Sequence, residues 1–109
     1  MGQRLKIQEK LETLCDHVYF QPPENIRMKY PCIVYKSRPG NDIYADNDRY
    51  LTVDEWEAVV VDRDPDSRIP RAVLAAFRYS RRGQPYTADN LHHFPITIKT
   101  IYEEDIENV

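Results

Sequence analysis

The sequence has few cysteines and few glycines, and it contains no long apolar run. Two of its 109 residues are cysteine and three are glycine. So few cysteines exclude a fold that depends on a framework of disulfides instead of a hydrophobic core. The absence of a run of about 18 apolar residues excludes a membrane-spanning helix. The chain also lacks an excess of positive charge, because its net charge is -3, which argues against a dedicated nucleic-acid-binding protein.

The composition predicts one soluble globular domain. Hydrophobic residues make up 41% of the chain and charged residues 30%, which is typical of a domain with its own core. We assign this domain to residues 1–102 and expect residues 103–109 to form a disordered acidic tail. Cys15 and Cys32 fall within apolar patterns, so we expect reduced, packed thiols in a reducing compartment. The polar segment Met1–Lys10 lacks the apolar core of a secretion signal.

Hydrophobic periodicity predicts two helices. Residues 3–16 carry apolar side chains at spacings of three and four, which forms one stripe along a helix. A second helix is predicted to follow the turn Asp64–Ser67, with Asp66 or Ser67 as its N-cap and Pro70 in its first turn. The stripe expected to be buried on this helix consists of Ala72, Val73, Ala76 and Phe77.

Alternating apolar residues predict a sheet. Strands are expected at residues 18–20, 32–36, 50–62, 78–84 and 94–102, with Trp56, Ala58 and Val60 on one face. Asp54–Glu55 interrupts the pattern and indicates a bulge or an exposed strand end. Ser37–Arg49 and Tyr86–His93 are predicted to be polar loops. The fold class is therefore α+β: a mostly antiparallel sheet of about four strands, with an N-terminal helix and a second helix packed on one face.

No residue pattern supports a metal site or a catalytic centre. Asp62-x-Asp64-x-Asp66 resembles the start of a calcium loop, but Ser67 and Val73 occupy the positions that need glycine and a bidentate glutamate. His92 and His93 are neighbours whose side chains point to opposite sides of a strand, so they are poorly placed to share an ion, even with Asp89. Neither cysteine has a glycine-rich oxyanion turn nearby. We therefore predict no metal, no cofactor and no enzymatic activity.

The one dense basic cluster is Arg78, Arg81 and Arg82, with Tyr79 between them. Three interpretations remain open for it. It is a solvated strand face, a contact to DNA phosphates, or a contact to an acidic surface of another subunit. The net negative charge favours a subunit contact over DNA, and the turn at Asp62–Asp66 of a neighbouring copy is a concrete candidate. The chain also has eight tyrosines, a residue type enriched at interfaces.

Five short turn-rich blocks recur in an order that resembles a family of small tailed-bacteriophage proteins, the tail terminators or tail-completion (head-tail joining) proteins. The resemblance runs from about Leu11 to Tyr102. The blocks are Phe20-Gln21-Pro22-Pro23-Glu24-Asn25, Tyr30-Pro31-Cys32-Ile33-Val34-Tyr35-Lys36, Tyr44-Ala45-Asp46-Asn47, Asp62-Arg63-Asp64-Pro65-Asp66-Ser67 and Tyr86-Thr87-Ala88-Asp89-Asn90-Leu91.

The resemblance implies a structural role in the virion. Members of this family that are similar in fold to classical tail terminators form rings, usually of six subunits, on the last ring of the tail tube. Such a ring stops polymerisation of the tube and offers a surface to the head connector, and DNA passes through its lumen without sequence-specific binding. The implied partners are further copies of the chain, the tail tube protein and the head connector, with no membrane. Assembly would take place in the host cytoplasm.

Two other roles remain open: a head-completion or connector protein of the phage neck, and a small non-catalytic adaptor encoded by a phage. From the family blocks and the basic cluster we predict a set of subunit or partner contacts. These residues are Tyr44, Asp46, Asn47, Tyr50, Asp64, Asp66, Arg78, Arg81, Arg82, Tyr86, Asp89 and Asn90.

Overall fold

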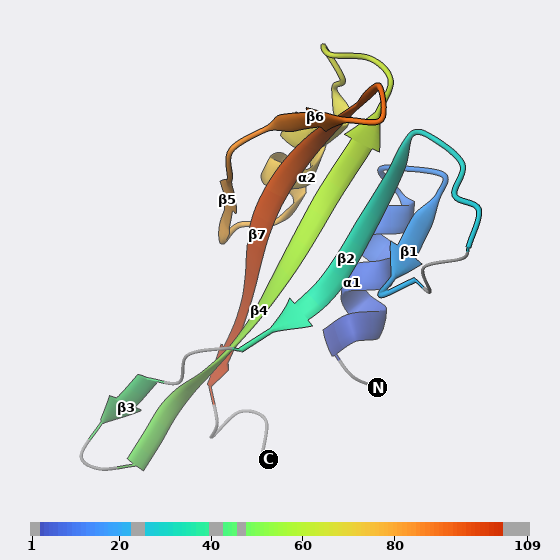
Figure 1. The fold of residues 1–109 in the computed structure, drawn as a ribbon. Coiled ribbons are helices and arrows are strands. Elements are labelled where there is room, and N and C mark those ends of the chain that lie inside the picture. The colour runs from blue at the N-terminus through green and yellow to red at the C-terminus, as the bar shows by residue number, and fades with distance from the viewer. Residues whose placement is uncertain (1–2, 23–25, 40–42, 46–47, 104–109) are drawn as a thin grey trace.

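A single mixed sheet with two helices forms the structure, a computed structural model that describes residues 3–22, 26–39, 43–45 and 48–103 (Figure 1). The α+β class is therefore confirmed. Within the described ranges the sheet has seven strands, so the prediction of about four strands was wrong. The elements in chain order are α1 (Gln3–Glu12), β1 (Val18–Phe20), β2 (Cys32–Arg38), β3 (Ile43–Ala45), β4 (Asp48–Asp62), α2 (Ile69–Ala76), β5 (Ser80–Arg82), β6 (Tyr86–Ala88) and β7 (Leu91–Glu103).

The central feature of the sheet is the antiparallel pair β4–β7, which runs from Leu51 opposite Glu103 to Asp62 opposite His92. The strand order is β1-β2-β4-β7-β5, with β3 paired to β4 and β6 paired to β7. Five of these pairings are antiparallel, as predicted, and β1 pairs with β2 in parallel. The pairing of β4 with β7 passes through Asp54 and Glu55 without a shift, so no bulge lies there. The alternative expectation of an exposed strand end was also wrong, because β4 continues through these residues from Asp48 to Asp62.

Both helices pack on the same face of the sheet, as the sequence predicted. Their buried residues join the inward residues of β2, β4 and β7 in one cluster. On the sheet side this cluster contains the predicted row Trp56, Ala58 and Val60. The remaining members are Ile7, Leu11, Cys15, Ile33, Tyr35, Val73, Phe77, Ile96 and Ile98.

Both helices differ in detail from the prediction. The first helix ends at Glu12 rather than at residue 16, and the hydroxyl of Thr13 donates to the carbonyl oxygen of Lys10 (2.6 Å). Such local bonds from threonine compete with continuation of a helix. The residue before α2 is Arg68, which makes no side-chain cap. The predicted cap by Asp66 or Ser67 was therefore wrong, although Ser67 Oγ accepts the backbone N–H of Ile69 (3.4 Å).

Both predicted polar loops contain strands. In the segment 37–49, β2 continues to Arg38, and β3 and the start of β4 pair with each other. In the segment 86–93, β6 and β7 form a hairpin whose turn residues Asp89 and Asn90 have φ values of 53° and 63°. Aspartate and asparagine enter this left-handed region more easily than other non-glycine residues, so they close a two-residue hairpin without glycine. The expected strand at 78–84 is limited to Ser80–Arg82.

Glu103 belongs to β7, so the prediction that the tail includes this residue was wrong. Residues 104–109 lie outside the described part of the chain. No helix among the described residues is long and apolar enough to cross a membrane.

Shortening a core side chain should cost much more stability than shortening an exposed neighbour. Ile96 is 1% exposed and lies in the core cluster. We expect Ile96→Ala to lower the free energy of unfolding by about 2–5 kcal/mol, because it removes buried methyl groups and leaves a cavity. The fluorescence of Trp56, the one tryptophan of the sequence, reports unfolding in urea.

The matched control is Lys99→Ala, on the same strand but exposed, which should change the free energy of unfolding by less than about 0.5 kcal/mol. Equal losses in the two variants would contradict the assignment of the core to this face of the sheet.

Candidate functional site

One end of the sheet projects beyond the helix-covered core as an arm (Figure 1). We define the arm as residues 43–45, 48–54 and 100–103, which belong to β3, β4 and β7. The core cluster on these strands ends at Trp56 and Ile98. Trp56 marks the base of the arm, where its Nε1–H donates to Thr100 Oγ1 (3.3 Å). The arm accounts for much of the elongation of the molecule, whose principal extents are 50 × 25 × 23 Å.

Part of the predicted contact set lies on this arm. Tyr44 is in β3, where it pairs with Arg49, and Tyr50 is in β4. Their side chains are not among the described atoms, and Asp46 and Asn47 lie outside the described residues. The structure therefore places Tyr44 and Tyr50 on the arm by their backbone alone.

A second part lies at the opposite end of β7, in the β6–β7 hairpin. Tyr86 is 51% exposed, and its ring stacks on His93 with the ring centroids 4.6 Å apart. Asp89 and Asn90 form the exposed turn. Because the arm and this hairpin are at opposite ends of one long strand, the predicted residues form two separate surfaces rather than one site.

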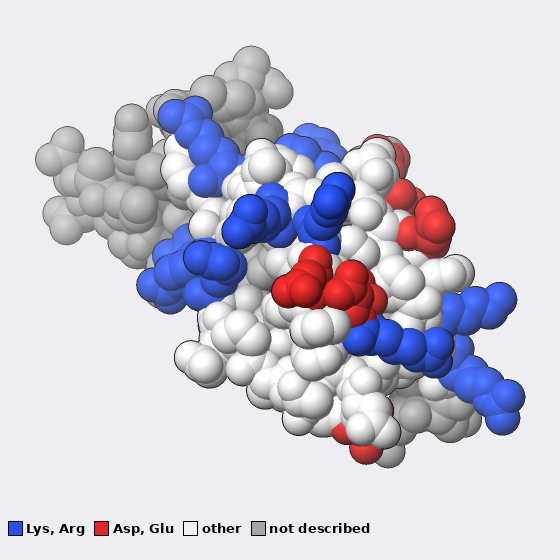
Figure 2. All heavy atoms as spheres, turned by 90° about the horizontal axis from the view of Figure 1, so that it is seen from above, with Lys and Arg blue, Asp and Glu red and all other residues white. Residues whose placement is uncertain are grey.

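The acidic turn between β4 and α2 lies at the same end of the sheet as the hairpin, because Asp62 pairs with His92. Asp64 and Asp66 are exposed. The backbone N–H of Asp64 donates to Asp62 Oδ1 (3.0 Å), and that of Asp66 donates to Asp64 Oδ1 (2.8 Å). The carboxylates of Asp62 and Asp64 therefore stabilise the conformation of the turn through hydrogen bonds within it. Figure 2, which views the molecule from this end, shows acidic and basic side chains interspersed rather than a field of one sign.

The arginine cluster lies on the edge strand β5 and the residues just before it. Arg78, Arg81 and Arg82 are exposed, and Tyr79 is 50% exposed. The guanidinium of Arg78 lies over the ring of Tyr79, 5.5 Å from its centroid. A shallow hollow of about 320 Å³ is bordered by Arg78, Tyr79 and Arg81 together with Lys99 of β7.

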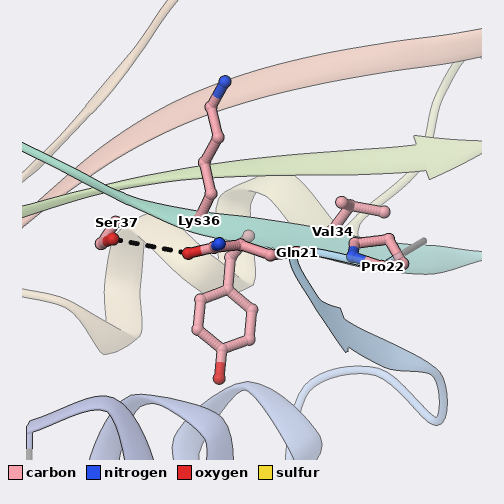
Figure 3. A pocket seen from close by; sticks show the side chains of 6 residues that line it. Gln21, Pro22, Val34, Lys36 and Ser37 are labelled. Atoms are coloured by element: carbon pink, nitrogen blue, oxygen red, sulfur yellow. Dashed lines mark hydrogen bonds between the residues drawn. The ribbon is translucent and has the colours of Figure 1, made fainter. Parts of the chain in front are cut away.

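A cleft that no sequence pattern predicts lies beside β2 (Figure 3). It has a volume of about 540 Å³, and its lining includes Gln21, Pro22, Lys36 and Ser37. Gln21 has a φ of 42°, so the chain turns away there, and β1 pairs with β2 only as far as Tyr35. A left-handed glutamine carries no sequence signal. Figure 3 shows Ser37 reaching Gln21, with Oγ donating to Oε1 (3.4 Å).

Two ion pairs cross the sheet face that is opposite the helices. Lys36 Nζ lies 3.4 Å from Glu57 Oε1, and an Arg38 guanidinium nitrogen lies 3.5 Å from Glu57 Oε2. Lys36 and Arg38 are two residues apart on β2, so both face Glu57 across the β2–β4 ladder. Such partly exposed pairs contribute at most about 1 kcal/mol. They fix side-chain positions on this face more than they stabilise the fold.

The histidine and aspartate residues do not assemble a metal site within the described ranges, where no three metal-binding side chains come together. His92 Nδ1 lies 3.4 Å from Thr87 Oγ1, whereas His93 stacks on Tyr86. Both histidines are therefore in contact with the β6 strand. The prediction that the protein is not an enzyme is not decided by these contacts.

Both cysteines are buried and reduced. The thiol of Cys15 lies 3.5 Å from the carbonyl oxygen of Pro31, to which it donates. Burial raises the pKa of the Cys15 thiol, and it raises the pKa of Cys32 to about 11, with the nearby Cys15 as a second cause. A reactive cysteine needs a lowered pKa and some exposure. The chemistry of these thiols is that of core residues, as their sequence positions predicted.

Comparison with known proteins gives a fold but no family. No protein-family model matches the sequence, and no curated protein matches it. One solved structure, known only by a sequence identifier, is similar with a TM-score of 0.54 and 20% sequence identity, over 95% of this chain and 96% of that chain. At this level of identity the likeness supports the α+β arrangement over nearly the whole chain.

Burial of Cys32 should make stability fall at alkaline pH. The folded thiol titrates near pH 11, whereas an unfolded thiol titrates at about 8.5. The contribution of the neutral thiol is therefore complete below about pH 8.5 and is lost as the pH rises towards 11. We expect the free energy of unfolding in urea to be lower at pH 10.5 than at pH 8.

Cys32→Ala is the control for this prediction. Burial also raises the pKa of Tyr35, so part of the alkaline loss should remain in Cys32→Ala, and the loss should be smaller than in the unaltered protein. An equal alkaline loss in both proteins would show that the Cys32 thiol is not responsible.

Proposed function

We propose that this protein is a structural component of a bacteriophage tail, which forms a ring, with six subunits as the expected number, at the end of the tail tube. In this role it stops polymerisation of the tube and joins the tube to the head connector. The order of turn-rich blocks in the sequence supports this family, and the α+β fold is compatible with it. The observation that carries the proposal is the arm.

The arm is expected to be only marginally stable in an isolated subunit. Narrow strand ribbons are marginally stable in water unless a further layer covers them. In the described part of the chain both helices pack against the other end of the sheet. A neighbouring subunit would supply the missing layer, and a protein that functions within an assembly has this layer available.

The two predicted contact surfaces also fit a ring. A ring needs head-to-tail contacts, in which one surface of a subunit meets a different surface of the next. The arm and the β6–β7 hairpin lie at opposite ends of the same strand, so each subunit presents two different surfaces. DNA would pass through the lumen without sequence-specific contacts, which agrees with the interspersed charges in Figure 2.

Two other roles use the same features. A head-completion or connector protein of the neck would also need head-to-tail contacts, and it differs from a terminator only in its position in the particle. Immunogold labelling of particles would separate these two roles. A non-catalytic adaptor would use the arm to bind one partner, and it would remain a monomer.

The mass of the protein in solution tests the proposal. We expect light scattering to show a closed ring, either for the protein alone or after addition of purified tail tubes. In the second case, electron microscopy should show added density at one end of each tube. A monomer that leaves the tubes unchanged would contradict the ring and favour the adaptor.

A variant that lacks the tip of the arm tests whether the arm is needed for ring formation. Replacement of residues 43–50 by Asn-Gly removes β3 and the start of β4 but leaves every residue of the core cluster in place. We expect this variant to unfold cooperatively and to lose ring formation. The matched control is Lys6→Ala, at an exposed position of α1 outside both proposed contact surfaces, which should leave both stability and assembly intact.

A further inference from the structure

The outer edge of β5 has the properties of a docking site for an acidic extended segment. Of its two edges, β5 uses one to pair with β7, and it is the last strand in the sheet order. The backbone N–H of Lys99 donates to the carbonyl oxygen of Tyr79 (2.8 Å), and that of Gly83 donates to Pro95 (2.8 Å). Residues 79, 81 and 83 therefore direct their backbone groups to β7. In an antiparallel ladder the backbone groups of Ser80 and Arg82 then point outward.

Positive charge is concentrated at this edge. Arg81 lies opposite Thr97, and Lys99 lies two residues further along β7, so Arg81 and Lys99 share one face of the sheet. Within the described part of the chain the ion pairs are those of Glu57 with Lys36 and Arg38. Arg78, Arg81, Arg82 and Lys99 have no such partner there. An open strand edge beside unpaired cations suits a partner strand that carries acidic side chains.

Residues 104–109 of the sequence have this chemistry. They contain three acidic residues and no basic one. Asp105 and Glu107 are two residues apart, so in an extended conformation they share one face. If the segment were added as a strand beside β5, that face would lie next to Arg81, with Lys99 one strand further in on β7. An acidic side chain directly opposite Arg81 would attract it and stabilise the contact.

The acidic turn at Asp62–Asp66 is a weaker candidate for this edge. The carboxylates of Asp62 and Asp64 already accept backbone N–H groups of the turn. Arg63 and Arg68 lie in the same short stretch of sequence and offset its charge. The turn is also not an extended segment, so it would leave the outward backbone groups of Ser80 and Arg82 without partners.

The segment must come from another copy of the chain. β5 pairs with residues 96–98 of β7, whereas residue 104 follows β7 at the arm (Figure 1). A return from Glu103 to the level of Ile98 would cover about 17 Å, and a strand along Ser80–Arg82 would need about 7 Å more. Six extended residues span about 20 Å, which is too short for both.

We propose that residues 104–109 of one subunit add as a strand to the outer edge of β5 of the next subunit, with Asp105 and Glu107 on the face of the sheet that carries Arg81 and, one strand further in, Lys99. The contact joins two different surfaces, so it is of the head-to-tail kind that closes a ring. This inference rests on the proposed ring and names one of its contacts.

Charge reversal tests the contact. Arg81→Glu with Lys99→Glu should weaken self-association at least tenfold, measured by sedimentation at several protein concentrations. Asp105→Lys with Glu107→Lys should weaken it to a similar extent. An equal mixture of these two variants should assemble again, because each supplies the charge that the other lacks. Lys6→Glu, an exposed change on α1, is the control and should assemble normally.

Several outcomes would overturn the proposal. Undiminished assembly of either charge-reversed variant, with an unchanged circular dichroism spectrum, would show that the contact lies elsewhere. Failure of the mixture to assemble would show that the two charge sets do not meet. Binding of duplex DNA that is lost in the Arg81→Glu, Lys99→Glu variant, with self-association unchanged, would assign the edge to phosphate binding instead.

A second experiment separates this contact from the ring proposal. A carrier protein that ends in residues 103–109 is titrated into a variant of this protein truncated after Glu103, and binding is followed by fluorescence anisotropy. Failure to bind, while the intact protein caps tail tubes, would overturn the contact and leave the ring. Binding that Arg81→Glu abolishes, in a protein that ignores tail tubes, would confirm the edge site and overturn the tail function.

Discussion

The antiparallel pairing of β4 with β7 is the constraint on which the rest of the structure depends. These two strands continue past both ends of β2 and β5, from the hairpin turn to the arm. Their register places Trp56 beside Ile98 and Ala58 beside Ile96, so alternate residues of both strands form the floor of one core. A slip of one residue would turn this row to the opposite face and expose it. The positions of β2, β5 and both helices follow from this floor.

The same pairing separates the three surfaces for which contacts with other molecules are proposed above. A strand rises about 3.3 Å per residue, so a ladder of this length holds the arm and the β6–β7 hairpin far apart. The edge strand β5 lies between them, along the flank of β7. The sheet thus acts as a rigid spacer that fixes the relative orientation of three exposed elements. Such fixed geometry is what a closed assembly requires, because a small angular error at each contact would prevent closure.

Local sequence patterns predicted the fold class, the core face and the positions of the central strands, because burial imposes strict alternation on Trp56, Ala58 and Val60. They did not predict features that depend on pairing between distant segments. β3 and β6 have only three residues each, and only their pairing with β4 and β7 makes them strands. Asp89–Asn90 and Gln21 adopt left-handed backbone without glycine. Aspartate and asparagine indicate a turn but do not specify a two-residue hairpin, and a glutamine carries no turn signal at all. Of the predicted contact residues, the sequence correctly placed Arg81 and Arg82 on a strand, but it carried no information about which residues lie at an edge.

The cations at the two opposite edges of the sheet affect whether molecules can add to one another without limit. Lys36 and Arg38 lie on β2 beyond the end of β1, on the opposite side of the sheet from Arg81 and Arg82. If β5 of one molecule paired directly with β2 of another, arginine and lysine side chains would be brought beside one another. Like charges in such positions repel, and natural sheets use them to avoid edge-to-edge aggregation. This repulsion disfavours edge-to-edge pairing of the sheets of successive molecules, which would build an open fibre.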